Sequence, residues 1–278
     1  MRRVNSTPTA VLGFLEKPSV QIMPHELALV MPVCNEQACI VAVVQSWLDV
    51  LSRLNIDFRF IILNDGSTDG TEEALAVFEH DRRLQVINKQ NTGHGPTILL
   101  GYRQAVELGE WVFQCDSDDE MNADYFPCLW EKRKEYHALL GKRAEYKQTR
   151  SRKFVSICSR IAIRLLYGSG VADVNTPFRL IRSNVLKQFV KQIPDDTFAP
   201  NILISGMLAR TGARIYEHPV PHEGRRTGKT SLVRLKLWRC ALKAFWQTLT
   251  WRRVVVFIDD KAAGTPETIR ENGSRGGR

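Results

Sequence analysis

Several features of other protein classes are missing from this chain. It contains no run of about 18 apolar residues, so we expect no transmembrane helix. Pro8 and charged residues interrupt any apolar stretch after Arg2 and Arg3, so we also expect no signal peptide. The six cysteines form no Cys-x-x-Cys pair and no disulfide-like framework. Reduced thiols in a cytosolic protein are therefore the expected state.

Acidic residues are absent from one long stretch of the C-terminal half. Residues 224–258 hold nine Lys or Arg and no Asp or Glu, and residues 132–164 hold eleven basic residues against two acidic ones. The net charge of +9 is therefore unevenly distributed. Basic stripes of this kind indicate an anionic partner, such as phosphate, a membrane surface or nucleic acid. A solvated basic face is the alternative, and it is weaker where acids are missing.

What is present begins with an alternation of strands and helices. The 278 residues, 44% hydrophobic and 25% charged, suffice for one large α/β domain or two small ones. Apolar runs predict strands at 27–31, 58–63, 84–87 and 111–115. The segments between them predict helices at 36–54, 70–79 and 96–108. This order is typical of a mostly parallel sheet flanked by helices, in which ligands bind at the carboxyl ends of strands.

An acidic motif follows the fourth predicted strand. Residues 114–120 read Gln-Cys-Asp-Ser-Asp-Asp-Glu, with Asp116 and Asp118 two positions apart. Residues i and i+2 of a strand point the same way, so these carboxylates repel each other unless a cation lies between them. Hard oxygen ligands at this place suit Mg²⁺ or Mn²⁺ bridging a diphosphate. The alternative is an acidic loop that caps the next helix.

Three further motifs follow the other strands. Residues 31–36 (Met-Pro-Val-Cys-Asn-Glu) fit a tight turn that presents backbone N–H groups to a ligand. In residues 64–71 (Asn-Asp-Gly-Ser-Thr-Asp-Gly-Thr), Asp65 can accept a hydrogen bond from a nucleotide base, or it can form an Asx turn or helix cap. Residues 91–95 (Asn-Thr-Gly-His-Gly) open a helix whose N-terminus favours anions.

In this order, the motifs resemble those of the inverting GT-A glycosyltransferases of family 2. The matching patterns are Pro32-x-x-Asn35-Glu36, Asn64-Asp65-Gly66-Ser67-x-Asp69-x-Thr71, Gly93-x-Gly95-x5-Gly101-x3-Ala105 and Asp116-x-Asp118-Asp119. The resemblance extends over residues 27–232 and implies a Rossmann-like GT-A fold and a nucleotide-sugar donor. Relatives often have Asp at the position of Asn64, and many have Gln at the position of Glu120.

The resemblance also implies roles for individual residues. Those expected to bind the donor are Pro32, Asn35, Glu36, Asp65, Gly93, Gly95 and Asp116. Among them, Asp65 is expected to meet the base. Asp116 and Asp118 are expected to hold the divalent metal, Mg²⁺ or Mn²⁺, together with the diphosphate, and Asp119 completes the catalytic group. The motifs leave GDP-linked and UDP-linked sugars equally open.

The second half is similar to the dolichyl- and polyprenyl-phosphate sugar synthases. Residues 173–179 (Asp-Val-Asn-Thr-Pro-Phe-Arg) match their pattern, except that proline replaces glycine. Residues 220–231 are similar to their basic acceptor segment. The resemblance places Arg152, Arg225 and Lys229 near an acceptor phosphate, because arginine contacts phosphate oxygens bidentately. Ordinary surface basic residues are the alternative.

Two classes of acceptor differ in the chemistry they need. A phosphate needs no strong base at pH 7, because its second pKa is about 6, but it needs basic residues to position it. A sugar hydroxyl needs a general base, for which Asp119 and Asp173 are the candidates. Attack from the face opposite the leaving group inverts the anomeric carbon.

The chain is expected to divide into four segments. Residues 1–24 form a disordered or loosely packed arm, residues 25–230 the catalytic domain and residues 259–278 a disordered tail. The pattern of residues 231–258 predicts a basic amphipathic helix at the C-terminal end of the fold. Such a helix lies on anionic lipid or, alternatively, packs against the core with its basic face outward.

The predicted function is transfer of a sugar from a nucleotide-sugar to a polyprenyl phosphate, dolichyl or undecaprenyl, in cell-envelope glycan synthesis. We expect a cytoplasmic protein attached peripherally to the inner face of the membrane, where an integral-membrane partner can substitute for missing spans. The alternatives are transfer to a glycan or glycolipid hydroxyl, and a non-catalytic membrane- or anion-binding module. Nucleic acid is not an expected partner, because the basic residues lack an interleaved aromatic stacking surface.

Overall fold

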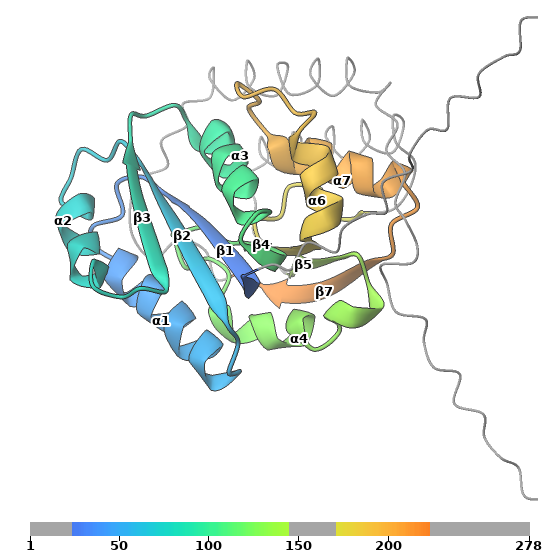
Figure 1. The fold of residues 1–278 in the computed structure, drawn as a ribbon, viewed down its shortest axis with the longest axis horizontal. Helices are drawn as coiled ribbons and strands as arrows, with labels where there is room; N and C mark the ends of the chain where they lie inside the picture. Colours follow the sequence, from blue (N-terminus) through green and yellow to red (C-terminus); the bar gives the residue numbers. More distant parts are fainter. Residues whose placement is uncertain (1–23, 145–170, 223–278) are drawn as a thin grey trace, which may run out of the picture.

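A mixed sheet with helices on both faces forms the body of the protein (Figure 1). The computed structural model describes residues 24–144 and 171–222. The strands are β1 (His25–Val33), β2 (Phe58–Asp65), β3 (Leu84–Lys89), β4 (Gly109–Gln114), β5 (Ala138–Ala144), β6 (Arg179–Arg182) and β7 (Ile215–Pro221). The helices are α1 (Ile40–Arg53), α2 (Thr71–Leu75), α3 (His94–Ala105), α4 (Phe126–Trp130), α6 (Ser183–Val190) and α7 (Pro200–Arg210). Short 3₁₀ turns are Ala76–Phe78, Ala123–Tyr125 and Arg133–Glu135.

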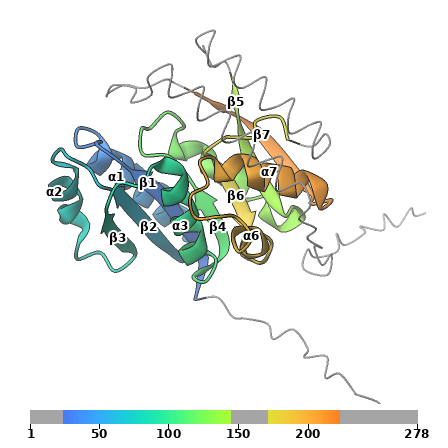
Figure 2. The same cartoon turned by 90° about the horizontal axis from the view of Figure 1, so that it is seen from above.

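The strand order is β3-β2-β1-β4-β6-β5-β7 in the described residues. The first four of these strands are parallel, β6 runs antiparallel to β4 and β5, and β7 is parallel to β5. Seen from above, β1 to β3 lie on the left and β5 to β7 on the right (Figure 2). The prediction of an α/β fold with a mostly parallel sheet is confirmed, and the carboxyl ends of β1 to β4 share one edge.

The four predicted strands and three predicted helices are all present, with shifted ends. The first helix begins at Ile40 rather than at Glu36, because the chain first makes a turn in which the Cys39 and Ile40 amides donate to Glu36 O. The helix predicted at 70–79 is split into α2 and a 3₁₀ turn. The helix predicted from Pro96 begins at His94, so that proline occupies the first turn, where its missing N–H is harmless.

Alternation along the strands builds a core on each face of the sheet. In β1, Leu27, Leu29 and Met31 join the core cluster that includes α1 and α4, whereas Ala28 and Val30 join the cluster that includes α3, α6 and α7. Figure 1 shows the same division, with α1 and α4 below the sheet and α3, α6 and α7 above it. Both faces of the central strands are therefore apolar, as expected for a covered parallel sheet.

An aromatic cluster joins the two halves of the described chain. Phe113 of β4 packs edge-on against Phe126 of α4 and against Phe178, which precedes β6, each with ring centroids 4.8 Å apart. The ring centroids of Trp47, in α1, and Phe113 lie 5.1 Å apart. Because Phe178 belongs to the segment similar to the sugar synthases, this packing fixes that segment next to the end of β4.

Several sequence predictions concern residues outside the described ranges. These are the arm at 1–24 except for its last residue, the segment 231–258, the tail 259–278 and the basic residues Arg152, Arg225 and Lys229. Within the residues that the structure describes, no helix is both long enough and apolar enough to cross a membrane.

Candidate active site

The loops after β1 and β2 are tied to each other at the carboxyl edge of the sheet. The Asn35 amide donates to Ser67 Oγ at 2.9 Å, and Asn35 Oδ1 accepts from the Thr68 amide at 2.7 Å. Asn35 has φ 58°, a left-handed conformation that asparagine tolerates better than most residues. These bonds make the two loops, which hold the first two motifs, one structural unit.

Glu36 and Pro32 lie beneath these loops. Glu36 is 7% exposed, and its amide donates to Thr71 Oγ1 at 2.9 Å, which links it to the start of α2. The Cys39 thiol donates to Glu36 Oε2 at 3.4 Å. Pro32 is buried in β1 opposite Leu63 of β2. The structure therefore places both residues at the base of the candidate donor site.

Asp65, the last residue of β2, has protein partners on both carboxylate oxygens. Oδ1 accepts from Lys89 Nζ and from the Thr92 amide at 2.8 Å, and Oδ2 accepts from the Gly93 amide at 2.9 Å. Burial alone would raise the pKa of Asp65, but the bonds from Lys89 and Thr92 outweigh it, so the pKa is lowered. Asp65 thus anchors the loop before α3. This role is similar to the helix-capping role that the sequence leaves open for Asp65.

Lys89 is a residue that the motifs did not single out. Its side chain is 16% exposed and donates to Asp65, to Gln90 O at 2.9 Å and to Thr92 Oγ1 at 2.7 Å. It stands in β3 directly opposite Asp65 in the parallel register. The sequence signal for this pair was a lysine near the end of one predicted strand and an aspartate just after the preceding one.

The two glycines of the third motif, Gly93 and Gly95, have different structural roles. Gly93 has φ 96° and open space where a side chain would stand. Gly95, in contrast, is pressed against the segment before α7: a Cβ there would lie 2.5 Å from Thr197 O and closer still to Phe198 O. The absence of a side chain at Gly95 is therefore explained by packing of α3 against another loop.

We expect Gly95→Ala to lower the free energy of unfolding by about 1–3 kcal/mol, because a backbone carbonyl cannot move aside as a side chain can. Gly70→Ala is the control, since its added Cβ meets the end of the Gln37 side chain. Urea unfolding of both variants measures the difference. Equal stability of the two variants would contradict the packing explanation.

The acidic motif turns away from the sheet just after β4. Asp116 Oδ1 accepts from Gln114 Nε2 at 3.0 Å and lies 3.6 Å from His94 Nε2 at the start of α3. Asp118 Oδ1 accepts from the Glu120 amide at 3.3 Å. Asp119 has φ 54°, so the chain reverses direction there. All three aspartates are partly exposed, and they follow β4 at the edge on which the first three motifs lie.

Glu120 links this motif to the far end of the described chain. Its Oε2 lies 2.8 Å from Nε2 of His222, whose side chain is only 2% exposed and which directly follows β7. This contact brings the beginning of the segment similar to acceptor segments to the acidic motif. The sequence motifs include both residues but give no sign of their pairing, which spans 102 positions.

Asp173, one candidate for a general base, is held in an ion pair. Its carboxylate accepts from Arg143 Nε at 2.7 Å and from Arg143 Nη2 at 2.8 Å, and its side chain is 16% exposed. Burial alone would raise the pKa of Asp173, but the Arg143 guanidinium outweighs it and holds the pKa below its usual range. A carboxylate so paired is a weak base.

The donor set at the end of β4 suits a divalent cation bound together with a phosphate ligand. Asp116 and Asp118 supply hard carboxylate oxygens from partly exposed side chains. In residues 24–144 and 171–222, no group of three or more His, Cys, Asp or Glu side chains is arranged to hold a metal ion. Mg²⁺ typically binds through one or two carboxylates plus substrate phosphates, so two carboxylates fit such a cation.

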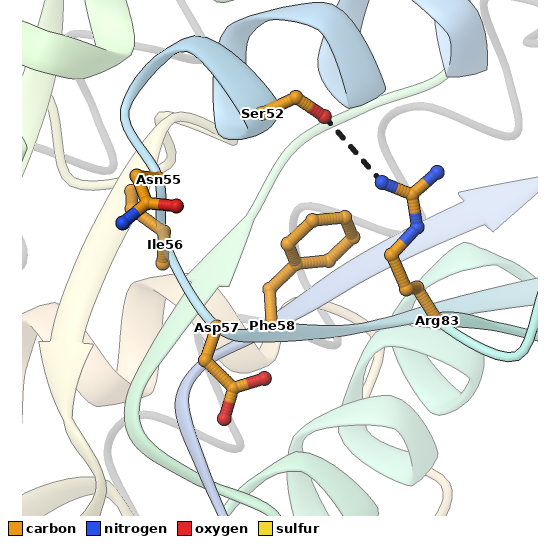
Figure 3. Close-up of a pocket in the computed structure, with 6 residues that line it drawn as sticks. All are labelled: Ser52, Asn55, Ile56, Asp57, Phe58 and Arg83. Atoms are coloured by element: carbon orange, nitrogen blue, oxygen red, sulfur yellow. Dashed lines mark hydrogen bonds between the residues drawn. The ribbon is translucent and has the colours of Figure 1, made fainter.

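A separate hollow lies at the opposite end of β2 (Figure 3). It has a volume of about 260 Å³ and is lined by Ser52, Asn55, Ile56, Asp57, Phe58 and Arg83. The Arg83 guanidinium is already held by Asp81, with Nη2 2.6 Å from Oδ2. The lining residues belong to none of the four motifs. They offer no set of reactive groups comparable to that at the carboxyl edge of the sheet.

Comparison with protein families identifies the family to which this fold and these motifs belong. A family model described as glycosyl transferase family 2 matches residues 28–190, which is more than half of the chain. The chain belongs to glycosyl transferase family 2. The four motifs of this family 2 protein all lie within the matched residues.

Among curated proteins, this family 2 chain is similar to undecaprenyl-phosphate 4-deoxy-4-formamido-L-arabinose transferases. The one from Pectobacterium atrosepticum is 27% identical over 216 residues, covering 76% of this chain and 64% of that protein. The one from Pseudomonas aeruginosa is 26% identical over 215 residues, covering 76% and 61%. The chain thus matches less than two thirds of the length of these relatives.

Among solved structures, the chain is similar to glucosyl-3-phosphoglycerate synthase from Mycobacterium tuberculosis. The complex with Mn²⁺, UDP and phosphoglyceric acid has a TM-score of 0.63 at 18% identity, covering 84% of this chain and 80% of that chain. The complex with Mn²⁺ and UDP-glucose has a TM-score of 0.60 at 19% identity, covering 82% and 79%. These likenesses confirm the GT-A fold.

Proposed function

We propose that this family 2 glycosyltransferase moves a sugar from a nucleotide-sugar to the phosphate of a polyprenyl phosphate. The observation that carries the choice of acceptor is the ion pair between Asp173 and Arg143, which occupies one of the two candidate general bases. A phosphate acceptor needs no strong base at neutral pH. The similarity to transferases named for undecaprenyl phosphate supports the same choice.

On the donor side, we assign the diphosphate and a divalent metal, Mg²⁺ or Mn²⁺, to Asp116 and Asp118. A metal bound there would offset the charge that develops on the departing nucleoside diphosphate. The other residues assigned to the donor site are Pro32, Asn35, Glu36, Asp65, Gly93 and Gly95. In this assignment Asp65 would accept a base N–H on a carboxylate that also accepts from Lys89 and from the amides of Thr92 and Gly93.

On the acceptor side, we assign Arg152, Arg225 and Lys229 to the phosphate. All three lie outside the described residues; the contact of His222 with Glu120 brings the described start of the segment 220–231 to the acidic motif. These cations would position the phosphate oxygen for attack opposite the leaving group, with inversion at the anomeric carbon. Segment 231–258 would hold the protein peripherally on anionic lipid at the cytoplasmic membrane face.

The acceptor class is tested with Asp119→Asn. We expect transfer to undecaprenyl phosphate to persist within about tenfold of the parent rate, because loss of a general base typically costs 10²–10⁴-fold. Asp173→Asn gives the same comparison for the second candidate base. Glycolipid formation is measured with undecaprenyl phosphate and with undecaprenol. A 10²-fold or larger loss in Asp119→Asn, or a preference for undecaprenol, would favour a hydroxyl acceptor.

Cys34 provides a test of the donor site without turnover. Its thiol is exposed at the end of β1, and partial burial together with the carboxylates of Asp65, Asp69 and Glu36 raises its pKa. We therefore expect slow alkylation by N-ethylmaleimide at pH 7. UDP with Mn²⁺, at ten times its dissociation constant, should slow the reaction about tenfold further by occupying the site.

Mass spectrometry of the Cys34 peptide measures this protection. Cys128 of α4 is the internal control, because it is partly exposed and belongs to none of the four motifs. Its labelling should not respond to UDP. Equal labelling of Cys34 with and without saturating UDP and Mn²⁺ would place the nucleotide elsewhere.

A further inference from the structure

A chain of buried polar side chains ends on Asp116. Gln114, the last residue of β4, is fully buried, and its Nε2 donates to Asp116 Oδ1 at 3.0 Å. Its Oε1 accepts from Asn201 Nδ2 at 3.0 Å. The amide orientation follows from chemistry, because a carboxylate can only accept and the amide nitrogen must therefore face Asp116.

Two more elements complete this chain. Asn201 belongs to α7 and is 4% exposed, and its Oδ1 accepts from the hydroxyl of Tyr102 at 2.9 Å. Tyr102 belongs to α3 and is 1% exposed. Burial raises the pKa of Tyr102, so its hydroxyl remains a proton donor at neutral pH. Side chains from α3, β4 and α7 thus form one hydrogen-bonded network.

The network also contacts the segment similar to the sugar synthases. The backbone carbonyl of Asn201 accepts from Nη1 of the fully buried Arg179 at 3.1 Å. Arg179 in turn donates to Thr176 O at 2.9 Å and to Val174 O at 3.3 Å. The orientation of Gln114 therefore depends on α7, and α7 is tied to the loop before β6.

Burying polar side chains disfavours folding unless each of them forms hydrogen bonds. Apolar side chains of equal size could fill this space. The network is buried except at one end, where it meets the partly exposed carboxylate of Asp116. The Gln114 amide group holds Oδ1 of Asp116, so that Oδ2 could bind a cation. Neighbouring hydrogen bonds of this kind orient metal-binding side chains in other proteins.

We propose that Gln114 and Asn201 are positioning residues, which orient the Asp116 carboxylate toward the divalent cation and diphosphate of the donor. This inference rests on the proposed function, because it takes Asp116 to be a metal ligand. It adds Gln114, the first residue of the acidic motif, to which the resemblance gives no role, and Asn201 of α7, which belongs to no motif.

The test compares Gln114→Met with the parent chain. Methionine preserves the length and approximate volume of the side chain but removes its hydrogen bonds with Asp116, Asn201 and Tyr102. We expect the affinity for Mn²⁺ in the presence of UDP, measured by electron paramagnetic resonance, to fall about 10–100-fold. UDP binding without metal should not change. The control is Gln45→Met, because Gln45 Nε2 also donates to an aspartate, Asp49 Oδ1 at 2.8 Å, on the exposed side of α1.

Equal Mn²⁺ affinity of folded Gln114→Met and the parent would overturn the inference and leave the proposed function intact. A parent chain that binds no Mn²⁺ with UDP would overturn the proposed function, and this inference with it. If Gln114→Met does not fold, Asn201→Ala takes its place. That variant removes the Nδ2 donor behind Gln114, and an unchanged Mn²⁺ affinity would again overturn the inference.

Discussion

Replacing Asp118 with asparagine should lower the rate of sugar transfer by about 10³-fold, because the carboxylate charge is lost where the leaving diphosphate must be stabilised. The fold should survive, since Asp118 is partly exposed and an asparagine oxygen can equally accept the hydrogen bond from the Glu120 amide. The measurement is the initial rate of nucleotide release coupled to product formation, with Mn²⁺ varied over a wide range.

Asp124→Asn is the matched control for this prediction. Asp124 is 63% exposed and pairs with Arg53, itself 67% exposed, in a surface ion pair. Such pairs contribute about 0–1 kcal/mol, so neither the rate nor the stability should change appreciably. An Asp118→Asn protein with the parent rate at all Mn²⁺ concentrations would remove Asp118 from the catalytic site.

Replacing Lys89 with methionine should lower the free energy of unfolding by about 3–5 kcal/mol, because it leaves the buried carboxylate of Asp65 without its charged partner. The Asp65 side chain is 5% exposed, and the uncharged donors of Thr92, Gly93 and Thr97 would be left to contact it. The loop before α3 is held by the same carboxylate, so donor binding should weaken as well.

The pH dependence gives this prediction a definite sign. The folded-state pKa of Asp65 is lowered, so its contribution to stability is present above the unfolded pKa of about 3.9 and is lost as pH falls through the lower folded value. In Lys89→Met, burial is opposed by the uncharged donors of Thr92, Gly93 and Thr97 and no longer by a positive charge, so this acid-sensitive contribution should shrink. The stability difference between parent and variant should therefore be larger at pH 7 than at pH 3.

Urea unfolding at both pH values tests this account of Asp65. The double variant Asp65→Asn/Lys89→Met should recover part of the loss, since it removes the unpaired charge. Lys187→Met is the control, because Lys187 pairs with Glu107, which is 48% exposed. A Lys89→Met protein no less stable than Lys187→Met would show that the buried pair does not stabilise the loop.

The first half of the fold could be predicted because its signals are local. Apolar runs mark β1, β2 and β4, whose two faces are covered, and the shorter, partly exposed β3 is likewise followed by a helical pattern. The second half gives weaker signals. Strand β6 has only four residues, and β7 contains Pro219 and Pro221, which argue against a strand unless it lies at an edge. Strand β7 is indeed one of the two edge strands of the described sheet.

The site could be predicted as a set of loops but not as a set of contacts. The motifs located the sheet edge at which Asp65 and Asp116 lie. They could not reveal that Asp65 pairs with Lys89 or that Asp173 pairs with Arg143, because these partners meet only when the strands and loops are packed together. The contact of Gln114 with Asn201 could not be predicted for the same reason, since Asn201 lies 87 residues later in the sequence.

The most direct test of the central claim is product formation by the full chain. It would be incubated with Mn²⁺ or Mg²⁺, a panel of GDP- and UDP-linked sugars and short-chain undecaprenyl phosphate, and glycolipid and released nucleoside diphosphate would be quantified together. The account predicts that one donor gives glycolipid and nucleoside diphosphate in equal amounts, and that both are lost in Asp118→Ala. Release of nucleoside diphosphate with no glycolipid from any donor would contradict transfer to a polyprenyl phosphate.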